Sequence, residues 1–264
     1  MPYGRELLLL GEKRNAVLGL SEVQRYGTDS YGDADYVSIF GLRPAQWHAK
    51  GIRLLGRTAV ECTRDALASA IGSDLAGIAA SAPRSCATLV VDPFVGSGNT
   101  LFWLLRCLPQ ARGIGFELDP GVFRLTRSNL ATLGLPIEIL NIDFRSGLEA
   151  IPAAADRLLM VFIAPPWGDA LDPVRGLDLR RTQPPIIEIV DLLIQRFGKC
   201  RLLCAIQLFE HVEHESLTEL AGRFDWHELR TYGLNVPGQN HGILIGTRFW
   251  QPTRERDEAS RDTA

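Results

Sequence analysis

The chain has 264 residues, of which 46% are hydrophobic and 22% are charged, and its mean hydropathy is close to zero. This is the composition of an ordinary globular protein with enough residues for a sizeable core. No apolar run approaches the roughly 20 residues that are needed to cross a bilayer, so we expect no membrane partner.

The charge balance argues against a protein that grips a long nucleic acid through many phosphates. The formal net charge is −3 and the pI is about 6.0, whereas such proteins are usually basic. A small substrate, or one nucleotide presented by a partner, fits better. The five cysteines are odd in number and lack the paired spacing of zinc sites, so we expect no metal and a reducing, cytoplasmic location. The composition leaves the oligomeric state open.

Residues 1–80 are predicted to form a helical extension. A short, mostly polar helix comes first, and residues 57–80 show helix-like spacing of apolar side chains. Between them, the segment 26–40 is rich in tyrosine and aspartate. That segment fits either ordinary packing or a lid over a site.

Residues 81–250 alternate predicted strands and helices, which favours an α/β fold with a mostly parallel sheet covered on both faces. The last two of its seven strands, joined by the turn-rich segment 235–240, are predicted to form an antiparallel hairpin. Residues 251–264 are polar and are predicted to be a disordered tail. The predicted strands are 88–92, 113–117, 137–141, 158–163, 201–207, 227–233 and 243–249, and the helices are 98–107, 119–133, 145–151, 185–196 and 215–222.

The most informative motif joins the first predicted strand to the next helix and reads VVDPFVGSGNT over residues 90–100. Asp92 ends a buried strand, and Gly96 and Gly98 let a ligand approach the backbone closely. A dinucleotide fingerprint needs a third glycine where Leu101 stands. S-adenosylmethionine (SAM) carries an ammonium group that favours a nearby carboxylate, so SAM is preferred over another nucleotide or a plain turn. The predicted cofactor-binding residues here are Asp92, Phe94, Gly96, Ser97, Gly98, Asn99 and Thr100.

Two further acids stand at the ends of predicted strands. Glu117, with Leu118 beside it, is placed to accept hydrogen bonds from the two hydroxyls of a ribose. A helix cap is the alternative, although Asp119 suits that role better because a proline follows it. Asp143 is predicted to meet the adenine amino group with Phe144 packing nearby, and a simple helix cap is almost as well supported.

The fourth predicted strand is followed directly by Ala164, Pro165, Pro166 and Trp167. Two prolines stiffen the backbone and leave carbonyl groups free to face a ligand. The indole of Trp167 is suited to stack on a base, especially a cationic one. These four residues are the predicted catalytic group, and a rigid loop with a core tryptophan is the structural alternative.

The segments 92–100 and 164–168 together resemble the trimethylguanosine synthase family, the RNA-cap guanine-N2 methyltransferases. The resemblance extends over roughly residues 30–250 and implies the class I SAM-dependent methyltransferase fold, which is Rossmann-like. It also implies that Asp92, Gly96 and Glu117 bind SAM, that Asp143 meets its adenine, and that Trp167 stacks on the methyl-accepting base. One position departs from the pattern, since Ala164 replaces the family's serine before the two prolines.

The sequence therefore predicts a SAM-dependent methyltransferase whose acceptor is an exocyclic amino group of a guanine-type base, in RNA or in a nucleotide. Ala164 and the acidic balance keep open a small-metabolite acceptor in the same fold. A SAM-binding protein without catalytic activity is a third, weaker interpretation.

Overall fold

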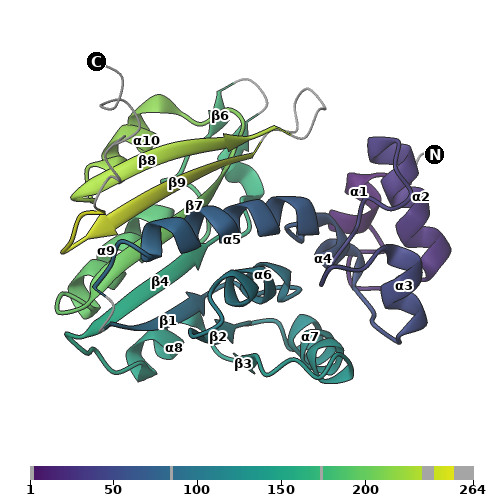
Figure 1. The fold of residues 1–264 in the computed structure, drawn as a ribbon. Helices are drawn as coiled ribbons and strands as arrows, with labels where there is room; N and C mark the ends of the chain where they lie inside the picture. The colour runs from purple at the N-terminus through teal and green to yellow at the C-terminus, as the bar shows by residue number, and fades with distance from the viewer. Residues whose placement is uncertain (1–2, 84–85, 173–174, 234–240, 253–264) are drawn as a thin grey trace, which may run out of the picture.

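The computed structural model describes residues 3–83, 86–172, 175–233 and 241–252. A seven-stranded sheet lies at its centre, in the order β3-β2-β1-β4-β7-β9-β8 (Figure 1). Two short strands form a separate antiparallel pair. The strands of the large sheet are β1 (Ala87–Asp92), β2 (Arg112–Phe116), β3 (Glu138–Leu140), β4 (Arg157–Ile163), β7 (Arg201–Phe209), β8 (Trp226–Tyr232) and β9 (His241–Arg248), and the short pair is β5 (Leu171–Asp172) and β6 (Gly176–Leu177).

The predicted topology is confirmed. Strands β1, β2, β3, β4 and β7 run parallel, while β9 pairs antiparallel with both β7 and β8. The sheet is therefore mostly parallel and ends in an antiparallel pair. The predicted turn at 235–240 and most of the predicted tail lie outside the described residues.

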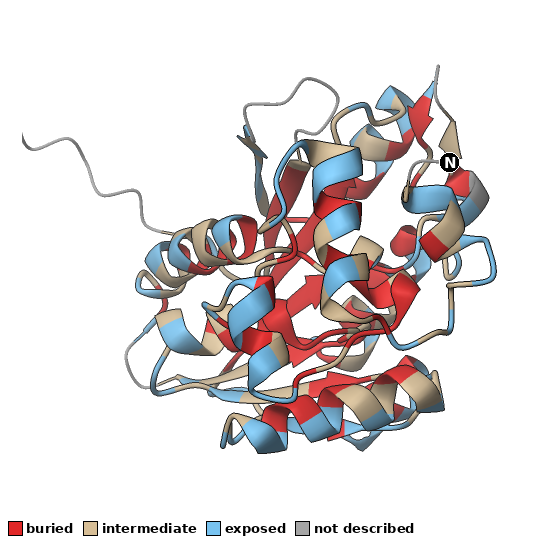
Figure 2. Ribbon diagram, turned by 90° about the vertical axis from the view of Figure 1, so that its right-hand side faces the viewer, coloured by how far each residue is buried: buried red, intermediate tan, exposed pale blue. Residues whose placement is uncertain are grey.

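Helices cover both faces of the sheet, because successive side chains of a buried strand point to opposite faces. Val90 and Met160 pack in one core cluster together with α5, α6 and α7. Val91 and Val161 pack in a second cluster together with α8, α9 and α10. Figure 2 shows the buried strands between helices whose outer faces are exposed. These helices are α5 (Asp65–Ala79), α6 (Asn99–Cys107), α7 (Pro120–Thr132), α8 (Phe144–Ala150), α9 (Ile186–Arg196) and α10 (His214–Ala221).

Four short helices precede α5 and gather at one end of the sheet (Figure 1). Tyr26 of α2, Trp47 of α3 and Ile52 of the loop before α4 are fully buried and belong to the same cluster as Val90 of β1. The indole nitrogen of Trp47 donates to the carbonyl of Val37 at 2.9 Å. The helices are α1 (Arg5–Leu9), α2 (Leu20–Tyr31), α3 (Pro44–Ala49) and α4 (Gly56–Glu61).

The helix-like spacing over residues 57–80 does not correspond to one continuous helix, because the helical conformation is interrupted between α4 and α5 at residues 62–64. The break is held by partners distant in sequence. The side-chain amide of Asn99 donates to the carbonyl of Thr63, and the N–H of Asp65 donates to the carbonyl of Ser38. Tertiary hydrogen bonds thus override a local helical preference.

The first residue of α4 is a tight packing point. A Cβ atom at Gly56 would overlap the carbonyl oxygen of Lys13. We therefore expect Gly56→Ala to lower the free energy of unfolding by about 1–3 kcal/mol, as overpacking does. Chemical denaturation monitors the change, with Gly77→Ala as a control because a Cβ there meets open space. Equal stability of the two variants would contradict the observed packing.

Candidate active site

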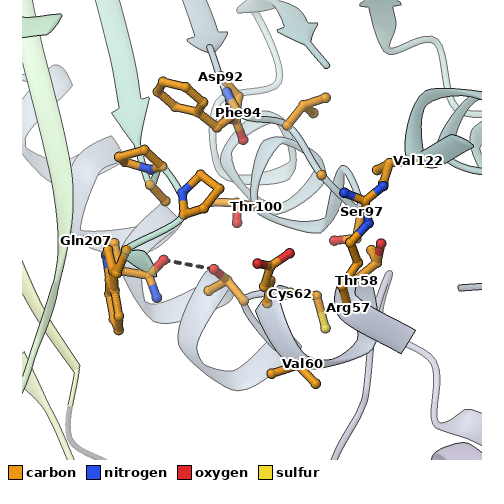
Figure 3. A pocket seen from close by; sticks show the side chains of 18 of the residues that line it. Arg57, Thr58, Val60, Cys62, Asp92, Phe94, Ser97, Thr100, Val122 and Gln207 are labelled. Atoms are coloured by element: carbon orange, nitrogen blue, oxygen red, sulfur yellow. Dashed lines mark hydrogen bonds between the residues drawn. The ribbon is translucent and has the colours of Figure 1, made fainter. Parts of the chain in front are cut away.

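A cavity of about 670 Å³ opens at the carboxyl ends of β1, β2, β4 and β7, and α4 forms part of its wall. Figure 3 shows Gln207 on one side of it, Arg57 and Val122 on the other, and Asp92 and Phe94 along its edge. Open α/β sheets bind ligands outside the carboxyl ends of their strands. Of the predicted cofactor-binding residues, the cavity is lined by Asp92, Phe94, Gly96, Ser97, Thr100, Glu117, Leu118, Asp143 and Phe144.

Asp92 ends β1 and is only 2% exposed. Its carboxylate accepts a hydrogen bond from the N–H of Phe94 at 3.1 Å. Burial, together with the charge of Glu117, raises the pKa of Asp92 from 3.8 to about 7. A cation bound in the cavity would favour the ionised form of this carboxyl.

Glu117 follows β2, and its two carboxylate oxygens accept from the N–H groups of Gly96 at 3.2 Å and Asp119 at 2.8 Å. Burial raises its pKa. The helix-capping role belongs to Asp119, whose side chain accepts from two N–H groups at the start of α7 and forms an ion pair with Arg57. Glu117 therefore does not cap α7, and it lies on the cavity wall beside the exposed Leu118.

Asp143 both caps a helix and lines the cavity. Its side chain caps α8 by accepting from the N–H of Arg145 at 2.9 Å, and it also lines the cavity. Phe144 packs against Phe94 with a centroid distance of 5.3 Å. The two rings form an apolar part of the wall beside an acid.

The predicted catalytic group lies along the same cavity, since Ala164, Pro165, Pro166 and Trp167 all line it. They follow β4 directly. The indole of Trp167 is partly buried and meets Phe209 of β7 edge to face at 6.0 Å. One aromatic surface thus faces the cavity from the loop after β4.

Two predicted cofactor residues, Gly98 and Asn99, are not among the residues that line the cavity. Gly98 has a positive φ of 80° and packs against Thr126 of α7. Asn99 is fully buried, and its side chain accepts from the N–H of Phe40 at 2.7 Å and donates to the carbonyl of Thr63 at 2.8 Å. Asn99 thus anchors the N-terminal segment to the start of α6.

We expect Asn99→Ala to lower the free energy of unfolding by about 2–4 kcal/mol, because two buried backbone groups lose their partners. Acceptor turnover should fall more than cofactor affinity, since Thr63 belongs to the part of the wall that Asn99 holds. Denaturation measures the stability, steady-state kinetics measure the acceptor turnover, and a cofactor titration measures the affinity. A loss of cofactor affinity with unchanged stability would instead indicate direct cofactor contact.

Sequence reasoning missed the far end of the cavity. Thr63 donates to the side-chain oxygen of Gln207 at 2.9 Å (Figure 3), and the amide nitrogen of Gln207 lies 3.4 Å from Nδ1 of His241. Tyr36 and Arg64 line the same cavity. Gln207 had a signal, because it is a polar residue that directly follows the apolar strand residues 202–206. Tyr36 also had one, because it belongs to the tyrosine-rich segment 26–40 that fits a lid over a site. Thr63, Arg64 and His241 had none.

Among the residues that the structure describes, no group of three metal-ligating side chains is found. In the same described part of the chain, no helix has the length and apolar character to span a membrane.

No family model and no curated protein matches the chain, so its solved structural neighbours supply the comparison. The METTL16 methyltransferase domain superposes with a TM-score of 0.50 at 15% identity, over 70% of this chain and 68% of that chain. A protein from Listeria monocytogenes that has been assigned to the class I SAM-dependent methyltransferases gives a TM-score of 0.49 at 12% identity, over 70% of this chain and 62% of that chain. An rRNA methylase from Streptococcus thermophilus gives 0.43 at 16% identity, over 67% and 94%.

This chain thus spans less than two thirds of the Listeria protein that it matches. The strand order and the METTL16 comparison together establish the fold as that of the class I SAM-dependent methyltransferases. The closer likeness to trimethylguanosine synthases stays a prediction from the sequence.

Proposed function

We propose that this protein is a SAM-dependent methyltransferase that acts on an exocyclic amino group of a guanine-type base. The observation that carries the proposal is a single cavity that joins acids at the ends of β1 and β2 to the Pro-Pro-Trp segment after β4. The acids are suited to bind the cofactor, and the Pro-Pro-Trp segment is suited to bind an aromatic acceptor.

The residues present fit SAM. Its sulfonium and ammonium groups are cationic, and the buried carboxyl of Asp92 and the half-buried carboxyl of Glu117 line the cavity wall. Among the described residues, neither carboxyl forms an ion pair with a basic side chain. Asp92 would hold the ammonium group, Glu117 the ribose hydroxyls, and Asp143 with Phe144 the adenine. When bound, SAM supplies an electrophilic methyl group.

The acceptor end positions an amino group without acid–base machinery. Trp167 offers a stacking surface, and the stiff backbone of Pro165 and Pro166 presents carbonyl oxygens that can accept from an amino group. Such bonds orient the nitrogen and favour its pyramidal, nucleophilic form. Catalysis then rests on proximity and alignment.

The test supplies SAM with a labelled methyl group to a cell extract that is separated into RNA and small-molecule fractions. Label that nuclease digestion of the RNA releases as N2-methylguanosine supports the proposal. Label in neither fraction, together with measured SAM binding, would favour a binding protein without catalytic activity.

A small-metabolite acceptor is the second candidate. Ala164 brings no side-chain hydroxyl to the acceptor end, and the chain has a net charge of −3. Label confined to the small-molecule fraction would establish this alternative. Turnover on such an acceptor should be insensitive to salt, unlike binding through several phosphates.

A further inference from the structure

The acceptor end of the cavity contains a guanidinium group with unused hydrogen-bonding capacity. Nη2 of Arg64 is buried and has no hydrogen-bond partner among the described residues, although the side chain lines the cavity. A buried donor without a partner is unfavourable, because it has lost its bonds to water. A ligand acceptor atom would remove that cost.

Aromatic stacking holds this guanidinium in place. Its central carbon lies 3.6 Å from the ring centre of Tyr36. Tyr36 stacks in turn on Tyr31, with ring centres 3.4 Å apart and planes within 7° of parallel. A guanidinium fixed on an aromatic face keeps its edge available for a planar or tetrahedral anion and loses little entropy on binding one.

The surrounding charges leave Arg64 uncompensated. The adjacent Asp65 is engaged elsewhere, since its carboxylate accepts from the indole of Trp103 at 2.6 Å and from the N–H of Gly41 at 2.9 Å. Burial, with a contribution from Arg64, lowers the pKa of His241 to about 4, so that this histidine is neutral at pH 7. This end of the cavity therefore attracts anions.

The nearby acid on α4 does not alter that balance. The side chain of Glu61 also lines the cavity, but the positive charges that influence it are those of Arg14, Arg57 and Arg5. No ion pair to Arg64 forms within the described part of the chain.

Arg64 lies beside the surface proposed for the acceptor base. Its neighbour Thr63 bonds to Gln207, two residues before Phe209, and Phe209 packs against Trp167. We infer that Arg64 binds a phosphate of the acceptor, so that the methyl acceptor is a nucleoside phosphate, free or within RNA, rather than a neutral nucleoside. This inference rests on the proposed function and names the substrate class of the same site.

The test measures ligand affinities of the protein saturated with S-adenosylhomocysteine, the demethylated cofactor. The probes are guanosine, guanosine 5′-monophosphate and a five-nucleotide RNA with one guanosine. The native protein should bind at least one phosphorylated probe about tenfold more tightly than guanosine, as a hydrogen bond to a charged group implies. Arg64→Met should reduce this ratio to about one without changing the affinity for guanosine, and Arg64→Lys should retain part of it.

Arg106→Met is the matched control. Arg106 also stacks on an aromatic ring, 5.4 Å from the ring centre of Trp103, but it does not line the cavity. Its loss removes the same charge and should leave the ratio at about ten. Tighter binding of guanosine 5′-monophosphate than of the pentanucleotide would identify a free nucleotide as the source of the phosphate. Tighter binding of the pentanucleotide alone, relative to guanosine, would identify RNA.

Three outcomes would overturn the inference: equal affinity of the native protein for all probes, no binding of any probe, or equal weakening of all probes by Arg64→Met. A titration of the protein with S-adenosylhomocysteine is carried out first, and it tests the cofactor site of the proposed function independently of Arg64. Failure of that titration refutes the cofactor site. Its success without a phosphate preference refutes only the role of Arg64.

Discussion

Replacing Asp92 with asparagine is expected to stabilise the cofactor-free protein at pH 8 and to weaken SAM binding by about 100-fold. The pKa of Asp92 is raised from 3.8 to about 7, mainly by burial. An acid whose pKa is raised in the folded state stabilises the fold when it is protonated. This stabilisation is present in full below pH 3.8, the pKa of the unfolded chain, and it is lost as the pH rises through about 7, the pKa in the folded protein. At pH 8 the buried carboxylate is ionised, which corresponds to about 4 kcal/mol of lost stability.

Asparagine removes that charge and retains an oxygen for the N–H of Phe94. We therefore expect a gain of about 2–4 kcal/mol at pH 8 that vanishes near pH 4. The loss of affinity follows from the lost charge-assisted bond to the cofactor's ammonium group. Denaturation at both pH values and a calorimetric titration test the two effects.

Asp156→Asn serves as the control, because Asp156 is exposed and does not line the cavity. It should change neither quantity appreciably. An Asp92→Asn protein that binds SAM normally would show that the ammonium group lies elsewhere. The same affinity argument predicts that native SAM binding weakens as the pH falls below about 7, since Asp92 then becomes protonated.

The second large effect is expected at the acceptor end, where Trp167→Ala should lower kcat/KM for the acceptor by about 100-fold. Stacking of a base on an aromatic side chain contributes about 1–3 kcal/mol, which corresponds to about 5- to 150-fold. The SAM dissociation constant should stay within about twofold, because the acids predicted to hold the cofactor follow other strands.

Trp167→Phe should retain most of the activity, since it keeps an aromatic face beside Phe209. Trp226→Ala is the control, because Trp226 lies on the edge strand β8 away from the cavity. Steady-state kinetics and a cofactor titration distinguish the two sites. Equal loss of acceptor turnover and SAM affinity in Trp167→Ala would contradict this division of the cavity.

The sheet and the cofactor side of the cavity were predictable because their signals are local. Each parallel strand is a short apolar run, and Asp92 and Glu117 stand at the ends of two of them. The carboxyl ends of parallel strands meet at one edge of a sheet. Once the strands are recognised as parallel, the two acids are expected to lie close together, and no long-range contact has to be known.

The role of Asn99 was not predictable in the same way. It belongs to the glycine-rich motif by sequence, yet its amide binds Phe40 and Thr63, which lie 59 and 36 residues away. The break between α4 and α5 has the same origin. Nothing in the spacing of apolar residues over 57–80 reveals a partner so distant in the chain.

The sequence by itself determined the alternation of strands and helices, the acids at the ends of β1 and β2, and the Pro-Pro-Trp segment. Only the tertiary structure decided what faces that segment. Arg64, stacked on Tyr36, and the contact between Thr63 and Gln207, 144 residues apart, arise because the N-terminal helices fold over the edge of the sheet. Periodicity records which face of an element is apolar, whereas the pairing of distant polar groups depends on how the elements pack.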